Sequence, residues 1–234
     1  TFGNEYKVPV TYNFNLAFER EVVTGLMARA AYVGSRNRNG RYTLQLNYAD
    51  KNIAGATTGN IDIRRIYAAA NLGNVESQAQ DRRSNYNSMQ LTLSKRYSGG
   101  FTITSNYTLS KVEGDFGGEI IPYTMNQDQS LLYGPLDQDH RHRFTTSWVL
   151  DLPGADMAGP LKHVIGGWQW TGVMQYQTGR PYTVTSGIDN SLDGIGNDRA
   201  KLTGVSVAPP DGAAQTVAFN AAAFARNDVG TFGN

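Results

Sequence analysis

The chain has 234 residues, no cysteine, and 21 lysine and arginine residues against 20 aspartate and glutamate residues, which gives a formal net charge of +1. The near-neutral charge argues against a nucleic-acid partner held by phosphate neutralisation, and the lack of cysteine excludes disulfide scaffolds, thiolate metal sites and cysteine nucleophiles. Charged residues make up 18% of the chain, below the roughly 25% of ordinary soluble domains. The 26 glycines and 13 tyrosines accompany many asparagine and threonine residues, a mixture that favours β-structure over helix.

Helical membrane spans and a signal peptide are not expected in this sequence. The longest purely apolar run is Ile66-Tyr67-Ala68-Ala69-Ala70, whereas a spanning helix needs about 20 apolar residues. The opening Thr1-Phe2-Gly3-Asn4 has neither the basic stretch nor the apolar stretch of a signal peptide. Membrane-spanning strands remain open, because a β-barrel needs alternation rather than an apolar block.

Apolar and polar residues alternate in six segments along the chain. Successive side chains of a strand point to opposite faces, so each segment places its apolar residues on one face of a predicted strand. The segments extend to roughly 9–13 residues, closer to a tilted membrane strand than to the strands typical of globular proteins. Their alternation is centred on residues 13–18, 42–48, 89–94, 101–110, 143–150 and 168–177.

The two faces of these segments favour a membrane barrel. Aromatic residues lie near the ends of the apolar rows, at Tyr42 and Tyr48, Phe101 and Tyr107, and Trp168 and Tyr176. Outer-membrane barrels carry aromatic girdles at both interfaces, and a polar lumen suits the threonine, serine, asparagine and glutamine of the opposite face. The predicted fold class is all-β, an antiparallel outer-membrane-type β-barrel. A large soluble β-sandwich or propeller with tyrosine-rich strands is the alternative.

The predicted connections are of two kinds. Short turns are predicted at residues 21–25 and 97–101, the second around Gly99-Gly100, which signals a hairpin. Long loops are predicted at residues 111–141 and 186–213. Short turns on one rim and long loops on the other are typical of bacterial outer-membrane barrels. Residues 50–84 stay undecided, because part of them suits either a short helix or a strand.

An ordered series of short motifs resembles one protein family. The series is Tyr32-Val33-Gly34-Ser35-Arg36, Tyr86-Asn87-Ser88-Met89-Gln90-Leu91, Ser105-Asn106-Tyr107-Thr108-Leu109-Ser110-Lys111, Asp139-His140-Arg141-His142-Arg143-Phe144, Gln177-Thr178-Gly179-Arg180-Pro181-Tyr182 and Gly230-Thr231-Phe232-Gly233-Asn234. It is similar, over nearly the whole chain, to the C-terminal barrel region of Oar-like TonB-dependent outer-membrane receptors of the acidobacterial and myxobacterial type.

The resemblance implies a barrel of about 22 strands with an N-terminal plug, an outer-membrane location, and uptake of a nutrient ligand driven through TonB. It implies outer-membrane lipid and lipopolysaccharide as partners, with the plug and TonB as further partners in the full-length protein. We interpret residues 1–234 as a single barrel region without the plug. The length allows roughly 10–14 long strands, fewer than the family's barrel contains.

A second hypothesis is a structural, self-assembling subunit derived from a β-barrel. An incomplete barrel leaves two strand edges open, and open edges pair with other chains, here with copies of the same chain. Thr-Phe-Gly-Asn stands at both ends of the sequence. A head-to-tail contact would therefore build a filament, at the cell surface or in an extracellular assembly.

The most enzyme-like cluster is Asp137-Gln138-Asp139-His140-Arg141-His142-Arg143. A loop anchor or a contact with lipopolysaccharide phosphate accounts for it better than catalysis, which needs a partnered and oriented base. We therefore expect no enzyme and no catalytic residue.

Two further groups are candidate binding residues. Asp189, Asp193 and Asp198 offer oxygen ligands for Ca²⁺, with Asx-turns that fold the loop on itself as the alternative. Polar side chains of the predicted lumen are candidate ligand contacts, namely Gln45, Asn47, Asn106, Gln175 and Gln177. These side chains tolerate sugar-like or peptide-like ligands without selecting one, and no other cofactor is predicted.

Overall fold

The computed structural model describes residues 7–115, 132–154, 159, 164, 166–194, 196, 198–214 and 217–233. Its long strands are β1 (Val10–Val23), β2 (Leu26–Gln45), β3 (Glu76–Ser98), β4 (Phe101–Gly114), β6 (His142–Asp151) and β7 (Gln169–Gln177). Two-residue strands are β5 (Gly134–Pro135), β8 (Lys201–Leu202) and β9 (Phe224–Ala225). The described residues also contain the short helix α1 (Ile61–Arg64) and 3-10 turns at Thr58–Asn60, Ala68–Ala70 and Ala221–Ala223.

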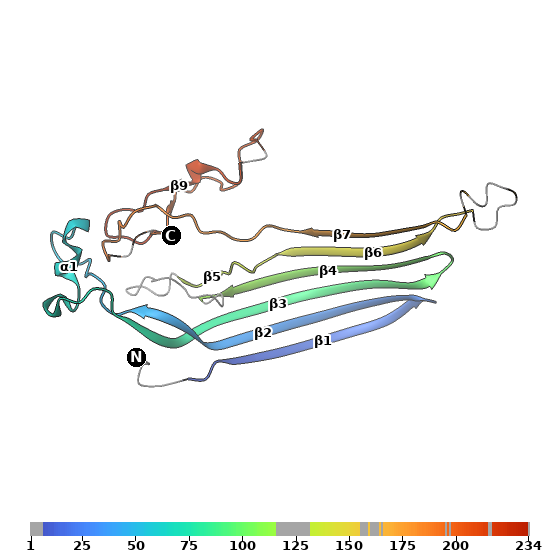
Figure 1. Cartoon of the computed structure of the whole chain (residues 1–234), viewed down its shortest axis with the longest axis horizontal. Helices are drawn as coiled ribbons and strands as arrows, with labels where there is room; N and C mark the ends of the chain where they lie inside the picture. The colour runs from blue at the N-terminus through green and yellow to red at the C-terminus, as the bar shows by residue number, and fades with distance from the viewer. Residues whose placement is uncertain are drawn as a thin grey trace.

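The long strands form one antiparallel sheet in the order β1-β2-β3-β4-β6-β7, with β5 beside the end of β4 (Figure 1). Each long strand pairs with the next long strand in the chain, so the sheet is a meander of hairpins. The predicted all-β, antiparallel class is confirmed. No helix in the described part of the chain has the length and apolar character needed to cross a bilayer.

The number of long strands in the described residues is six rather than the expected 10–14. The strands are longer than the sequence pattern suggested, since β2 has 20 residues and β3 has 23. Much of the remaining chain lies in the loop after β2 and in the segment after β7. The expected number of strands is too high because the strands are longer, and the loops contain more residues, than that number assumes.

The predicted short turns lie at one end of the sheet and the segment after β7 at the other, whereas residues 116–131 of the predicted loop 111–141 lie outside the described residues. At one end, β1 and β2 are joined through Thr24-Gly25, and β3 and β4 through Gly99-Gly100. Gly99 and Gly100 have φ values of 61° and 81°, the left-handed conformations that a two-residue hairpin turn requires and that glycine adopts without strain. The loop 46–75, β5 and the segment after β7 lie at the opposite end (Figure 1).

The undecided residues 50–84 divide into a loop and a strand. Residues 46–75 form a loop that contains α1 and two 3-10 turns, and β3 begins at Glu76. The strand predicted at residues 42–48 ends at Gln45. Just before it, the pairing of β2 with β3 shifts on both sides of Gly40, so the regular alternation of β2 is interrupted there.

Candidate functional site

The pairing register of the strands builds one apolar face, which we call the outer face. Side chains on neighbouring strands stand level with their register partners, so a row can be followed across the sheet. One row crosses the long strands as Phe18, Ala30, Leu91, Tyr107, Phe144 and Tyr176. The next row on this face runs Leu16, Tyr32, Met89 and Leu109. The apolar sets predicted strand by strand therefore fall on one face of the folded sheet.

The height of the outer face is close to that of the apolar band of an outer-membrane barrel. On β4 it runs from Phe101 to Leu109, about 27 Å of strand. At the usual tilt of an outer-membrane barrel this is roughly 20 Å of height, close to the apolar band of about 25 Å in such barrels. Its large side chains are accessible: Phe18 is 70% exposed and Tyr176 63%. Such a face suits acyl chains and would be costly in water.

Aromatic side chains mark the tight-turn end of the outer face. Phe101, Leu150 and Trp170 stand in one row there, and the Trp170 ring meets Trp148 edge-on with 5.4 Å between ring centroids. Tyr42 and Tyr48 do not belong to a girdle. Tyr42 is 5% exposed beneath the Arg82 guanidinium, which lies 3.8 Å from the ring centroid, and Tyr48 follows the end of β2.

The opposite, inner face of the sheet carries hydrogen-bonding side chains. One of its rows crosses the sheet as Glu19, Arg29, Thr92, Asn106, Thr145 and Gln175. The Thr92 hydroxyl donates to Asn106 Oδ1 at 2.9 Å, and Gln175 Nε2 donates to Gln177 Oε1 at 3.3 Å. Three predicted ligand contacts, Asn106, Gln175 and Gln177, are therefore neighbours on one polar face. Their role in binding stays a prediction.

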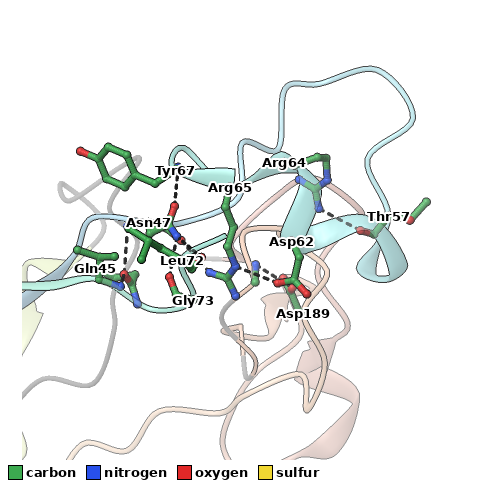
Figure 2. A network of polar contacts seen from close by, with 12 residues as sticks. Gln45, Asn47, Thr57, Asp62, Arg64, Arg65, Tyr67, Leu72, Gly73 and Asp189 are labelled. Atoms are coloured by element: carbon green, nitrogen blue, oxygen red, sulfur yellow. Dashed lines mark hydrogen bonds and ion pairs between the residues drawn. The ribbon is translucent and has the colours of Figure 1, made fainter. Parts of the chain in front are cut away.

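The other two predicted ligand contacts lie elsewhere. Gln45 is 2% exposed and Asn47 is fully buried, at the start of the loop that follows β2 (Figure 2). Asn47 Nδ2 donates to the carbonyl oxygens of Leu72 and Gly73 at 2.7 and 2.6 Å, and its Oδ1 accepts from the Tyr67 backbone N–H at 2.7 Å. These amide groups hold the loop together and do not line the inner face beside the other three.

A buried arginine closes the same loop. Arg64 is 4% exposed, and its guanidinium donates to three neutral oxygens: the Asp50 carbonyl at 2.6 Å, the Thr57 carbonyl at 3.0 Å and Asn60 Oδ1 at 2.7 Å. The neighbouring Arg65 pairs with Asp62 at 3.0 Å (Figure 2). Buried polar groups are tolerated only when they are bonded in this way.

This loop also contacts the segment that follows β7. The Ala49 backbone N–H donates to the Asp193 carbonyl at 2.9 Å. Lys51 Nζ donates to the Gly230 carbonyl at 3.1 Å and lies 4.2 Å from the centroid of the Phe232 ring. We call the described residues within 46–75 and 186–233 together the loop assembly. It joins the connection between β2 and β3 to a segment that follows the far edge of the sheet.

The three candidate calcium ligands belong to the loop assembly. Asp189 Oδ2 accepts from the Gly194 backbone N–H at 3.0 Å, and Asp198 Oδ2 accepts from the Ser191 backbone N–H at 2.6 Å. Asp193 is 3% exposed. Among the described residues, no three His, Cys, Asp or Glu side chains form a group that could hold a metal ion. The carboxylates of Asp189 and Asp198 thus fold the loop on itself, and Ca²⁺ binding stays a prediction.

The histidine cluster lies where β4, β6 and the end of β7 meet. His142 Nδ1 is 2.8 Å from the Tyr107 hydroxyl, and the two rings are stacked. His140 Nδ1 is 2.8 Å from the Thr178 carbonyl oxygen. Asp139 is 7% exposed and accepts from the Val112 backbone N–H at 2.9 Å. These contacts join β6 and the residues just before it to β4 and to the residue that follows β7, which fits the interpretation of this cluster as an anchor.

A cavity of about 440 Å³ lies between residues 132–137 and the segment after β7. Its lining includes Tyr133, Pro135, Tyr182, Val184, Arg199 and Phe224. Burial lowers the pKa of Arg199 from its ordinary value, because desolvation disfavours the charged form. No motif in the sequence indicates this cavity, since its aromatic residues are far apart in the chain.

The comparisons with known proteins agree with this architecture. The model of a family described as outer membrane beta barrel domain matches residues 1–234. A search of the curated proteins and a search of the solved structures each returned no match.

Proposed function

The chain belongs to the outer membrane β-barrel domain family, and from this membership we propose that it forms part of the wall of a TonB-dependent receptor that takes up a nutrient ligand. The family membership supports an outer-membrane protein. The motif series that resembles Oar-like receptors supports the more specific function.

One observation carries the proposal, namely the strip of amide and hydroxyl side chains on the inner face of β4, β6 and β7, beside which Arg143 stands level with Thr108 and Gln177. Asn106, Thr145 and Gln175 stand level across three neighbouring strands, directly behind the outer row that contains Tyr107 and Phe144. Amides and hydroxyls both donate and accept hydrogen bonds without attracting ions. A wall of this chemistry fits neutral polar ligands such as oligosaccharides or uncharged peptides.

The cavity in the loops supplies a first contact for such a ligand. Tyr133, Tyr182 and Phe224 contribute aromatic surface to it, and pockets of this kind combine apolar walls with a few polar groups. It lies at the long-loop end, which in outer-membrane barrels faces the outside. We assign the loops the capture of ligand and the inner face its passage.

The test uses the full-length protein in outer-membrane vesicles and in cells that lack their own copy of the gene. Fluorescent neutral oligosaccharides and uncharged peptides serve as probes. We expect accumulation of one probe class against its gradient, loss of accumulation after a protonophore is added, and reduced accumulation in the Gln175→Leu, Gln177→Leu double variant. Gln169→Leu, on the same face of β7 at the tight-turn end, is the matched control. Uptake of the probe that stays unchanged after the protonophore is added would instead indicate a passive channel.

The second candidate function is self-assembly into a filament. It is favoured by β1 and β7, each of which has a neighbour on only one side in the described sheet. Electron microscopy of native material distinguishes the two functions. Fibres that form without detergent would support self-assembly, whereas single particles that require detergent would support the receptor.

A further inference from the structure

The outer face changes character just beyond its apolar rows at the long-loop end. On β2 the next outward side chains are Arg36 and Arg38, level with Tyr12 and Val10 on β1. On β4, Lys111 is the next residue of the outer face after Leu109. Three cations thus stand along one rim of the apolar face, two on β2 and one on β4, with β3 between these strands. The carboxylate of Glu113 accompanies them and forms an ion pair with Lys111.

Arg36 is held in a fixed orientation. One guanidinium nitrogen donates to the carbonyl oxygens of Ser35 and Tyr86 at 2.9 Å each, and another donates to Asn87 Oδ1 at 2.7 Å. The guanidinium carbon lies 5.2 Å from the centroid of the Phe14 ring. These partners are all neutral, so they orient the guanidinium and leave its charge uncompensated.

Arg38 is held in a similar way. Its Nη1 donates to the Asn37 carbonyl at 2.7 Å and to Asn85 Oδ1 at 3.0 Å. Residues of β2 and β3 therefore position both guanidinium groups, which belong to residues two positions apart on the same face of β2. Arginine in such an arrangement binds phosphate with parallel hydrogen bonds and loses little side-chain freedom in doing so.

A hollow of about 730 Å³ lies lower on the outer face. Small side chains, Ala28 and Ala30, form part of its lining, with larger ones from Phe18, Leu91, Tyr107 and Phe144 around them. Arg36 and Ala30 are six residues apart on β2, about 20 Å of strand. At the tilt of a barrel strand this is roughly 15 Å of depth, half of the hydrocarbon core.

We propose that this face binds lipopolysaccharide, with a lipid A phosphate on Arg36 and Arg38 and an acyl chain in the hollow. The long-loop end of an outer-membrane barrel faces the outside, and the outer leaflet is where this phosphorylated lipid is found. The spacing between the arginines and the hollow fits a headgroup at the rim with its acyl chain below. The inference rests on the outer-membrane location and is independent of the uptake function.

The opposite rim of the outer face supplies a matched control. Lys95 stands level with Leu26 at the tight-turn end and is not part of the hollow's lining, and Lys95→Gln removes a cation from the same face towards the inner leaflet. The Lys95 ammonium donates to the carbonyl oxygens of Ser98 at 2.7 Å and Phe101 at 3.3 Å, and a glutamine amide can donate there as well. Arg20, the other cation of that rim, lines the hollow and is therefore left unchanged.

The experiment measures the affinity of the full-length protein in detergent for lipopolysaccharide, for the same lipid after its lipid A phosphates are removed, and for phosphatidylethanolamine. We expect lipopolysaccharide to bind wild type at least about tenfold more tightly than the other two lipids. A tenfold ratio of dissociation constants corresponds to a difference of about 1.4 kcal/mol in binding free energy. The Arg36→Gln, Arg38→Gln double variant is expected to lose this preference, and Lys95→Gln to keep it.

The comparison of lipids on wild type decides the proposal even when the double variant does not fold. Equal binding of intact and dephosphorylated lipid by wild type would overturn it. An unchanged preference in the folded double variant, or an equal loss in Lys95→Gln, would overturn it as well. None of these outcomes depends on whether the protein takes up a nutrient.

Discussion

The sheet and the loop assembly are stabilised in opposite ways. The sheet carries its large apolar side chains outward, where Phe18 is 70% and Leu93 44% exposed. The loop assembly is held from within by polar groups, and Asn47 and Ser191 are fully buried there. A bilayer accepts apolar side chains and offers no hydrogen bonds, whereas a loop in water can bury polar groups only when they are paired. The surroundings of each region thus decide which side chains it turns outward.

The largest expected effect comes from placing a charge on the outer face. Leu91→Arg puts a guanidinium in the middle of the apolar band, level with Ala30 and Tyr107. We expect a loss of about 2–4 kcal/mol in the free energy of unfolding, the cost of arginine near the bilayer midplane of an outer-membrane barrel. Urea titration of the protein folded into lipid vesicles measures this loss.

The adjacent residue provides the control. Gln90→Arg introduces the same side chain one position away on the inner face, between Ala31 and Thr108, and we expect little change in stability. Equal losses for the two variants would mean that the two faces do not meet different solvents.

The alternation along the chain was sufficient to predict this difference between the faces. Residues 101–110 read as a strand with Phe101, Ile103, Tyr107 and Leu109 on one side, and β4 has that arrangement. Period-two alternation is a local property that the pleat of a strand imposes directly. The Gly99-Gly100 turn was predictable for the same reason, since its backbone conformation depends on those residues themselves.

The loop assembly could not be predicted in this way. Gln45 and Asn47 continue the alternation of β2, so local sequence cannot tell whether they line a lumen or end a strand. Their surroundings come from residues that lie far away in the chain, such as Leu72 for Asn47 and Asp193 for Ala49. A buried polar network depends on partners at long sequence separation, and a single sequence does not identify them.

A second, smaller effect is expected inside the loop assembly. Asn47→Ala leaves the Tyr67 N–H and the Leu72 and Gly73 carbonyl oxygens without their partner. We expect the local opening free energy of residues 46–75 to fall by about 1–3 kcal/mol, the usual cost of unsatisfied buried groups. Hydrogen exchange measures this fall.

Two comparisons make the test specific to the loop. The exposed Asn52→Ala is the control variant, and exchange in β3 and β4 should stay as in wild type. A uniform increase in hydrogen exchange across the sheet would show that the sheet and the loop assembly are not stabilised independently.

The smallest expected effect lies at the tight-turn end. Gly99→Ala places a Cβ at a φ of 61°, which costs about 1 kcal/mol for an L-residue. Gly99→Asn should cost less, because asparagine tolerates the left-handed region. The same urea titration compares the two variants. An alanine variant as stable as wild type would contradict the assignment of this turn to left-handed backbone.

The central claim is that the outer face of the sheet meets lipid and the inner face meets water. The most direct test of this claim uses single cysteines, because the chain has none of its own. Cysteine is placed in turn at Gln90, Leu91, Thr92, Leu93 and Ser94 of the protein folded into vesicles. In one experiment, the reaction of each cysteine with a water-soluble maleimide is measured. In a second experiment, a fluorophore is attached to each cysteine, and its quenching by a lipid-dissolved quencher is measured. We expect reaction in water at positions 90, 92 and 94 and quenching from lipid at positions 91 and 93. Accessibility that does not alternate along these five positions would contradict the account.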